Sequence, residues 1–270
     1  MSDLDYLEKY TQEQVNTIAN ELWDKLTKKC SRQEKPQLWI IGGQPGAGKS
    51  SSKRKIESNL NSNIINIDYD EIRAKHPNAK KLYQKGKEDS SDYSERTNQF
   101  AKEVGNILIK RAAENNYNIM IEKTMNKSSS VKELIKQLPN HDVNISVVTC
   151  NAVNSKNSVY ARYQMAKYKF EKDQKEDPPR FIESYYIDKC LQGLGKATQE
   201  IATDPTIKLK NLRIETRNEN FIYRPLFDIN AKQSQSISTR LLEYNPKQIE
   251  RLINNAIGLE VTSKNKEKNR

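Results

Sequence analysis

The sequence predicts an α/β fold in which a mostly parallel sheet of about five strands is flanked by helices. Short apolar runs, such as residues 38–41 and 119–121, alternate along the chain with stretches that place apolar residues at helical spacing. No internal repeat and no long Gly/Ser or Pro linker interrupts this alternation. Strands that alternate with helices pair in parallel, because each helix carries the chain back across one face of the sheet.

The individual elements follow from these patterns. Parallel strands are expected at residues 38–41, 64–67, 117–121 and 145–149. Helices are expected after the first strand and at residues 12–28, 98–114 and 131–138. The runs 212–216 and 221–223, which four polar residues separate, are typical of a C-terminal hairpin. Residues 246–257 favour a last helix.

The segment GQPGAGKS, residues 43–50, fits the pattern G-x-x-x-x-G-K-[ST] of a phosphate-binding loop (P-loop) without mismatch. It follows an apolar strand and opens a helix, which is the context that the motif requires. Glycines let successive N–H groups curve around phosphate oxygens, toward which the helix directs its positive end. Lys49 is expected to reach the β- and γ-phosphates, and the Ser50 hydroxyl to bind Mg²⁺. The expected nucleotide-binding residues are Gly43, Gln44, Pro45, Gly46, Ala47, Gly48, Lys49, Ser50 and Ser51.

Carboxylates follow two of the expected strands. Asp68 and Asp70 come directly after residues 64–67, and Glu122 follows residues 117–121. Parallel strands all end at the edge of the sheet that carries the P-loop. A carboxylate there can accept the proton of an attacking hydroxyl, as kinases require, and Asp70 is the first candidate. A second role for Asp70, compatible with catalysis, is to cap a helix that begins at Glu71.

Residues 152–203 form a long, charged helical region that can fold over a bound nucleotide as a lid. Phosphoryl transfer needs positive charge over the migrating group, and Arg162 and Arg180 in this region are candidates for it. Spacing alone does not distinguish them from arginines on a solvated surface. The expected organisation is an N-terminal helical segment at residues 1–34, a P-loop kinase domain at 35–260 and a basic disordered tail at 261–270.

Three segments together resemble the zeta toxin family, the kinase half of bacterial epsilon/zeta toxin–antitoxin pairs. They are residues 38–55, IDYDEIRAKHPN at 67–78 and YNIMIEKT at 117–124, and the likeness extends over about residues 12–224. The resemblance implies a P-loop kinase fold and an activity that uses ATP and Mg²⁺. The phosphoryl acceptor would be a sugar hydroxyl of a UDP-activated amino sugar, chiefly UDP-N-acetylglucosamine. That reaction would drain a cell-wall precursor, and a small helical antitoxin that blocks the ATP site would restrain it.

The resemblance also implies roles for individual residues. Lys49 resembles the phosphate-binding lysine of the family, Ser50 its Mg²⁺ hydroxyl, and Asp70 its general base toward the sugar hydroxyl. Arg162 in YARYQ and Arg180 in PPRF are expected to contact the phosphates. The residues expected near the substrate are Asp68, Asn106, Glu122 and Thr124.

Two departures from the family pattern lie on the acceptor side. The family's I-E-G-T is I-E-K-T here, so Lys123 replaces a glycine and could narrow the acceptor pocket or add a contact to an anion. Where the family often carries a substrate-contacting glutamate, the register gives Asn106, with Glu103 about one turn earlier. The chemistry of the kinase is therefore better specified than its acceptor.

The bulk properties exclude several classes of protein. No segment reaches the roughly 18 apolar residues of a membrane span, and the N-terminus lacks the pattern of a signal peptide, so a cytoplasmic protein is expected. Three widely spaced cysteines and two histidines give neither a disulfide framework nor a metal centre. A net charge of +11 fits either a solvated basic surface or an anionic partner, and it does not choose among a nucleotide, a nucleic acid and an acidic protein.

Two alternatives to the sugar-nucleotide kinase stay open at this stage. One is a kinase of the same fold with another acceptor, such as a nucleotide cofactor or a polynucleotide end; the other is an ATP-binding module that binds nucleic acid. The amphipathic segment at residues 4–28 also allows two roles. It can cover the sheet, which is the favoured reading, or it can obstruct the nucleotide.

Overall fold

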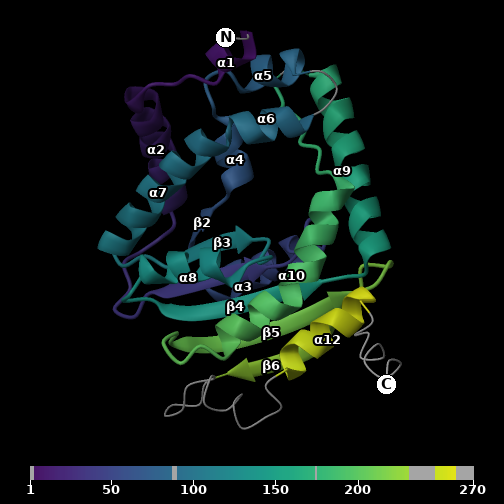
Figure 1. Ribbon diagram of the computed structural model, residues 1–270. Helices are drawn as coiled ribbons and strands as arrows, with labels where there is room; N and C mark the ends of the chain where they lie inside the picture. The colour runs from purple at the N-terminus through teal and green to yellow at the C-terminus, as the bar shows by residue number, and fades with distance from the viewer. Residues whose placement is uncertain (1–2, 87–89, 174, 231–246, 260–270) are drawn as a thin grey trace, which may run out of the picture.

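The structure is a computed structural model that describes residues 3–86, 90–173, 175–230 and 247–259 (Figure 1). The basic tail predicted at residues 261–270 lies outside the described residues. No helix in the described ranges is long and apolar enough to cross a membrane.

One sheet of six strands organises the fold, in the order β2-β3-β1-β4-β5-β6. Its strands are β1 (Gln37–Gly42), β2 (Ile65–Ile67), β3 (Ile119–Lys123), β4 (Asp142–Thr149), β5 (Leu209–Arg217) and β6 (Tyr223–Asn230). The strands β1 to β5 pair in parallel, and β6 pairs with β5 antiparallel. The predicted mostly parallel sheet and the C-terminal hairpin are confirmed. The first strand of that hairpin, β5, also extends the parallel sheet, so its C-terminal end reaches the edge that carries the P-loop.

The central strand β1 explains the most apolar run of the sequence. Its neighbours β3 and β4 pair along both of its edges, and helices cover both faces of the sheet. Leu38, Ile40 and Ile41 are accordingly fully buried. A strand enclosed on every side can carry apolar residues without alternation.

The helices match the predicted pattern over most of the chain. They are α1 (Asp3–Leu7), α2 (Gln12–Thr27), α3 (Ser50–Asn59), α4 (Tyr69–Ala74), α5 (Ala79–Lys85), α6 (Ser90–Arg96), α7 (Asn98–Glu114), α8 (Ser128–Lys136), α9 (Ala152–Lys172), α10 (Ser184–Ala202) and α12 (Gln248–Ile257). The region predicted as a lid, residues 152–203, is α9, a connecting segment and α10. The short helices α5 and α6 were not predicted.

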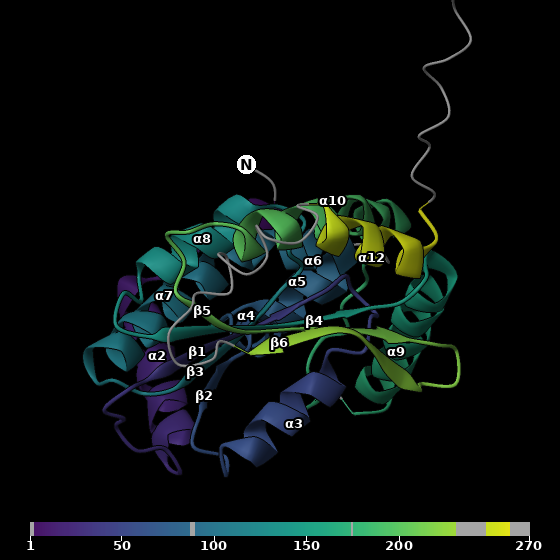
Figure 2. The same ribbon diagram turned by 90° about the horizontal axis from the view of Figure 1, so that it is seen from below.

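The helices form a layer on each side of the sheet. With the sheet seen edge-on, α3 covers one face, and α7, α8, α10 and α12 lie over the other (Figure 2). The large core lies on the α7 side, whereas a smaller cluster of Ile41, Ile56, Ile64 and Met120 joins α3 to the sheet. The short helices α4 to α6 and the long helix α9 stand beyond the sheet (Figure 1).

The N-terminal segment packs on the helices beside β2. A capping box between Thr11 and Gln14 starts α2, which packs on α7 and β2, and α1 packs on α5. The hydroxyl of Tyr10 donates to Glu103 Oε1 at 3.0 Å, and Arg96 forms ion pairs with Asp5 and Glu8. These contacts confirm the covering role of the segment.

Phe100 is the largest fully buried side chain and joins the N-terminal segment to the core. Its ring packs edge-on against Tyr10 and His76, each with ring centroids 5.1 Å apart.

We expect Phe100→Ala to lower the free energy of unfolding by about 3–5 kcal/mol, because it leaves a cavity that the neighbours cannot fill. Urea denaturation measures the change. Lys110→Ala on the same helix, whose side chain is 77% exposed, is the control and should cost less than about 0.5 kcal/mol. Equal costs for the two variants would contradict this packing.

Candidate active site

The P-loop connects the central strand β1 to α3, as predicted. Gly43, Gly46 and Gly48 all have positive φ, at 140°, 77° and 94°. A Cβ on Gly43 would lie 2.1 Å from the carbonyl oxygen of Val148, and one on Gly48 would lie 2.4 Å from the Tyr223 hydroxyl. Glycine is therefore required at both positions by backbone conformation and by space.

Gln44 fixes the start of the loop to the end of β4. Its buried side chain donates from Nε2 to the carbonyl oxygen of Cys150 at 2.9 Å and accepts from the Thr149 hydroxyl at 3.1 Å. The residue after the fourth predicted strand, Cys150, thus supports the loop. Asn151 caps α9 by accepting from the backbone N–H of Asn154 at 2.8 Å.

The side chain of Lys49 folds back onto the P-loop. Its Nζ donates to the carbonyl oxygens of Gly43 and Gln44, at 3.0 and 3.1 Å. Burial lowers the pKa of Lys49, the charge of Arg162 acts in the same direction, and Glu122 opposes the change. The ammonium group has hydrogen bonds to carbonyl dipoles, and a phosphate would give it a full counter-charge.

The oxygen donors near Lys49 are chemically suited to Mg²⁺. Ser50 is the first residue of α3 and is exposed, and the carboxylate of Glu122 interacts electrostatically with those of Asp68 and Asp70. Within the described residues, no group of three or more His, Cys, Asp or Glu side chains could hold a metal by itself. Mg²⁺ is commonly held by one or two protein oxygens together with substrate phosphates, so these residues fit the ion when a nucleotide is bound.

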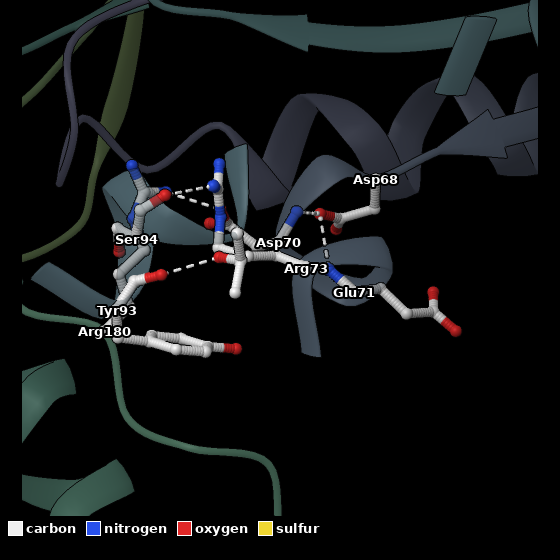
Figure 3. A network of polar contacts seen from close by, with 8 residues as sticks. Asp68, Asp70, Glu71, Arg73, Tyr93, Ser94 and Arg180 are labelled. Atoms are coloured by element: carbon white, nitrogen blue, oxygen red, sulfur yellow. Dashed lines mark hydrogen bonds and ion pairs between the residues drawn. The ribbon is translucent and has the colours of Figure 1, made fainter. Parts of the chain in front are cut away.

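Asp70 lies among arginines (Figure 3). Arg180 Nη1 donates to Asp70 Oδ1 at 2.5 Å, and Arg73 Nε lies 3.7 Å from the same oxygen. Arg73 is itself fixed, because its Nη1 donates to the carbonyl oxygen of Ser94 at 2.6 Å. The structure thus joins two residues that the sequence proposed separately, Asp70 and Arg180, and adds Arg73.

The charge of Asp70 is set by these neighbours. Removal from water by itself would raise the pKa of Asp70, but the charges of Arg180, Arg73 and Arg162 outweigh this effect and lower it below the ordinary value of 3.8. The side chain keeps 49% of its surface exposed, so an acceptor can approach the carboxylate. Asp70 is therefore ionised and accessible at neutral pH.

Arg162 shares a cavity with this pair. A space of about 440 Å³ between α9 and the segment before α10 is lined by Asp70, Arg162, Lys169, Glu176 and Arg180. The side chain of Arg162 is exposed, and within the described part of the chain it forms no hydrogen bond or ion pair. The two arginines that the sequence proposed thus face one cavity together with Asp70.

Asp68, rather than Asp70, caps α4. Its Oδ1 accepts from the backbone N–H groups of Asp70 and Glu71, at 2.9 and 3.4 Å, while Oδ2 lies 3.8 Å from Lys53 Nζ. The alternative helix cap proposed for Asp70 is wrong, because α4 begins at Tyr69, two residues earlier than the sequence suggested. The earlier start frees the Asp70 carboxylate from a capping role.

Glu122 lies near the P-loop lysine. Burial raises the pKa of Glu122 above its ordinary value, while the charges of Lys49 and Lys53 act in the opposite direction. Thr124 follows on the same chain segment, and its hydroxyl donates to Asn126 Oδ1 at 3.5 Å. Burial raises the pKa of Tyr186 and that of Cys190 on α10, and the Thr124 side chain acts to lower both. Of the predicted substrate residues, Glu122 therefore lies at the end of β3 near the P-loop, and Thr124 lies just beyond the strand, near α10.

Lys123 occupies the space beside Tyr69. Its Nζ lies 5.5 Å from the centroid of the Tyr69 ring, and burial lowers the pKa of Lys123. On the side of α7, Gly105 makes room for the ring, since a Cβ there would lie 2.6 Å from Tyr69 Cε1. Asn106, the neighbouring residue, is exposed, and its side chain forms no hydrogen bond with any described residue.

Sequence reasoning missed two arginines of the site. Arg73 lies one helical turn after Asp70, a spacing at which two side chains meet on a helix. Arg217 is the last residue of β5 and contacts the P-loop with its guanidinium group. The rule that residues at the carboxyl ends of strands belong to the site would have identified Arg217, had it been applied to the fifth strand as well as the first four.

A P-loop at the carboxyl edge of a parallel sheet, with a carboxylate and several arginines facing it, defines a kinase-type phosphotransferase of the P-loop class. The comparisons with known proteins agree. The zeta toxin family model matches residues 20–225, and the chain belongs to the zeta toxin family.

Individual relatives are similar to the chain at moderate identity. Toxin PezT of Streptococcus pneumoniae is 26% identical over 198 residues, which cover 73% of this chain and 74% of that protein. A solved chain of the PezAT chromosomal toxin–antitoxin system of the same organism superimposes with a TM-score of 0.67 at 21% identity, covering 92% of this chain and 94% of that one. A solved AvrRxo1-ORF1:-ORF2 chain with ATP has a TM-score of 0.55 at 14% identity, covering 88% and 70%. The two structures show the same fold.

The Asp70–Arg180 ion pair is open to direct measurement. In the folded wild type, the ¹³C resonance of the Asp70 carboxyl group should titrate below pH 3.8, because the arginine charges stabilise its ionised form. Arg180→Gln should raise this pKa. Arg162→Gln is the matched control and should raise it less, since its charge has a smaller effect than that of Arg180. An Asp70 pKa that does not respond to Arg180→Gln would exclude the pair in solution.

Proposed function

We propose that the chain is an ATP-dependent kinase that phosphorylates a sugar hydroxyl of a UDP-amino sugar such as UDP-N-acetylglucosamine. It would act as a toxin by depleting cell-wall precursors. The observation that carries this proposal is the position of Asp70. It is an ionised carboxylate, held by Arg180 at the edge of the sheet that carries the P-loop.

The donor half of the site supports ATP. The P-loop offers backbone N–H groups and the ammonium group of Lys49. The hydrogen bonds of that ammonium group go to carbonyl oxygens of the loop. Mg²⁺, held by Ser50 and the nucleotide phosphates, would neutralise part of the phosphate charge. The fold-related AvrRxo1 chain has been solved with ATP, which supports the same nucleotide here.

The arginines would stabilise the phosphoryl group during transfer. Arg162 has no partner for its side chain among the described residues, and the buried Nε of Arg180 has no hydrogen-bond acceptor there. Arg162 is therefore available to phosphate oxygens, and Arg180 lines the same cavity. Positive groups that are already in place stabilise developing charge without a cost of reorganisation.

Asp70 would act as the general base. Its carboxylate accepts the proton of the sugar hydroxyl while the hydroxyl oxygen forms a bond to the γ-phosphorus atom. The bond from the γ-phosphorus to the bridging oxygen breaks, and ADP leaves with that oxygen. The products are the phosphorylated sugar nucleotide, ADP and one proton, which Asp70 releases to solvent.

The acceptor assignment rests on family membership and on the residues after β3. Glu122 lies at the end of β3 near Lys49, and Thr124 follows the strand near Tyr186 of α10. A carboxylate and a hydroxyl can bind sugar hydroxyl and amide groups by hydrogen bonds. Asp68 has one carboxylate oxygen outside its capping role, and we include it with Asn106 among the acceptor residues.

A small helical antitoxin is the partner we propose. The solved relative with the higher TM-score belongs to a chromosomal toxin–antitoxin system. A kinase that consumes an essential precursor has to be restrained in its own host, and the N-terminal helices α1 and α2 cover α5, α7 and β2 instead of the P-loop. Restraint is therefore expected from a separate chain, together with a cytoplasmic location in which the toxin meets its nucleotide substrate.

The proposal is tested by incubating the full chain with ATP, Mg²⁺ and UDP-N-acetylglucosamine. We expect a phosphorylated sugar nucleotide, detected by mass spectrometry, and ADP in equal amount. Lys49→Ala is the matched control and should remain folded but inactive, because Lys49 supplies charge to the phosphates. The absence of a phosphorylated sugar nucleotide at high enzyme concentration would exclude this acceptor.

A second candidate is a kinase of the same fold with another acceptor. The position of Lys123 over Tyr69 favours it, because a lysine stands where the family pattern has glycine. The same assay with labelled ATP and a panel of UDP-sugars, nucleotide cofactors and polynucleotide ends separates the two candidates. Transfer to one of the latter two classes, at a higher rate than to any UDP-sugar, would replace the first proposal.

Asp70→Asn tests the general base. We expect this substitution to reduce the rate of transfer by about 10²–10⁴, the usual contribution of a general base, and to leave ATP affinity within a few-fold. Single-turnover kinetics measure the rate, and equilibrium titration measures the affinity. A large loss of ATP affinity with a normal rate of transfer would assign Asp70 to nucleotide binding instead.

A further inference from the structure

Side chains from outside the P-loop donate hydrogen bonds to the carbonyl groups of consecutive loop residues. The carbonyl oxygen of Pro45 accepts from the Ser155 hydroxyl at 2.5 Å, and that of Gly48 accepts from the Tyr223 hydroxyl at 3.0 Å. Between them, the carbonyl oxygens of Gly46 and Ala47 both accept from Arg217. Four consecutive carbonyl groups are thus held by α9, β5 and β6.

Arg217 makes the two central contacts of this set. Its Nη2 donates to the Gly46 carbonyl oxygen at 2.8 Å, and its Nε donates to that of Ala47 at 3.1 Å. Nη2 also donates to the Ser158 hydroxyl at 2.9 Å. The guanidinium group lies 4.3 Å from the centroid of the Phe221 ring, and the residue is only 3% exposed. The side chain therefore has one geometry, which its hydrogen bonds and the ring fix together.

The charge of Arg217 has no carboxylate partner. Among the described residues, none of the ion pairs includes Arg217, although its guanidinium group is buried. A buried charge without a counter-charge is unfavourable unless dipoles or a ligand compensate it. Two P-loop carbonyl groups supply dipoles, and the phosphates that the loop binds would supply the opposite charge.

We propose that Arg217 is a positioning residue of the nucleotide site, which holds the Gly46 and Ala47 carbonyl groups away from the phosphates. A peptide group is planar, so a carbonyl oxygen that is held on one side directs the N–H group of the same peptide to the other. Arg217 thereby fixes the orientation of two peptide N–H groups. That of Ala47 donates to the Gln44 carbonyl oxygen at 3.2 Å and closes the turn of the loop, and that of Gly48 would bind the β-phosphate. This inference rests on the proposed nucleotide binding and is independent of the acceptor.

Lysine and methionine distinguish a positioning role from a simple charge effect. Arg217→Lys keeps the charge, but a lysine cannot bind the two carbonyl groups with the planar geometry of a guanidinium group. Arg217→Met keeps most of the volume and removes both charge and hydrogen bonds. Tyr223→Phe removes one hydroxyl from the same set of contacts and is the milder probe. Lys210→Gln on β5 is the control, because it removes a positive charge from the same strand at a partly exposed site.

The experiment measures the affinity of the full-length chain for ADP and for AMP, with Mg²⁺ and no acceptor, by calorimetry or NMR titration. We expect Arg217→Met and Arg217→Lys each to weaken ADP binding by about 10- to 100-fold, the range for hydrogen bonds made by a charged group. AMP, which lacks the β-phosphate, should lose less than about 3-fold. Tyr223→Phe should weaken ADP binding by about 3- to 10-fold, and Lys210→Gln should have no effect.

Several outcomes would overturn the inference. Unchanged ADP affinity in a folded Arg217→Met protein would show that the loop is oriented without Arg217. Wild-type ADP affinity in Arg217→Lys would show that only the charge of Arg217 matters. An equal loss for AMP and ADP would place Arg217 against the base, in the cavity of about 280 Å³ that it lines with Asn151 and Asn154. If Arg217→Met does not fold, Tyr223→Phe decides by the same criteria. Failure of the wild type to bind ADP would instead overturn the proposed function along with this inference.

Discussion

The orientation of the P-loop peptides is the constraint on which the rest of the site depends. A loop can bind phosphates through its N–H groups only if its carbonyl groups have partners elsewhere, because buried carbonyl oxygens without partners are unfavourable. In this chain Ser155, Arg217 and Tyr223 provide those partners. The glycines allow the required backbone, and the surrounding side chains select it from the conformations that glycine permits. The site is thus defined from both sides, by the loop sequence and by distant residues.

A second charge arrangement surrounds Asp70, the general base that we propose. Asp70 is ionised because arginines surround it, and it is directed outward because Asp68 caps the helix in its place. The neighbouring Arg73 is held by the Ser94 carbonyl oxygen, so a helix that packs behind the site fixes one of these charges. The short helices α5 and α6, with α1 packed on α5, therefore stabilise the surroundings of Asp70.

Local patterns in the sequence predicted the features that depend on local physics. The P-loop motif, the buried strand β1 and the long amphipathic helix α7 are each determined by neighbouring residues, and all three are confirmed. The start of α4 was missed because two aspartates compete for one cap, and only tertiary packing decides between them. The strand-end rule could have placed Arg217 at the site, but its contacts could not be predicted, because its partners are backbone carbonyl groups 170 and 171 residues away and a carbonyl group leaves no signal in the sequence. The joint cavity of Arg162 and Arg180 required the path of α9, which no periodicity gives.

The distance along the chain between the P-loop and its supports has a consequence during protein synthesis. Arg217 and Tyr223 leave the ribosome about 170 residues after the loop residues whose carbonyl groups they bind. At a synthesis rate of roughly 5–20 residues per second, these partners follow the loop by on the order of 10–30 s. In that interval a nascent chain holds the phosphate-binding motif without the side chains that orient it. Synthesis therefore has to pass Tyr223 before the contacts that orient the loop can form, so translation itself delays the assembly of the P-loop.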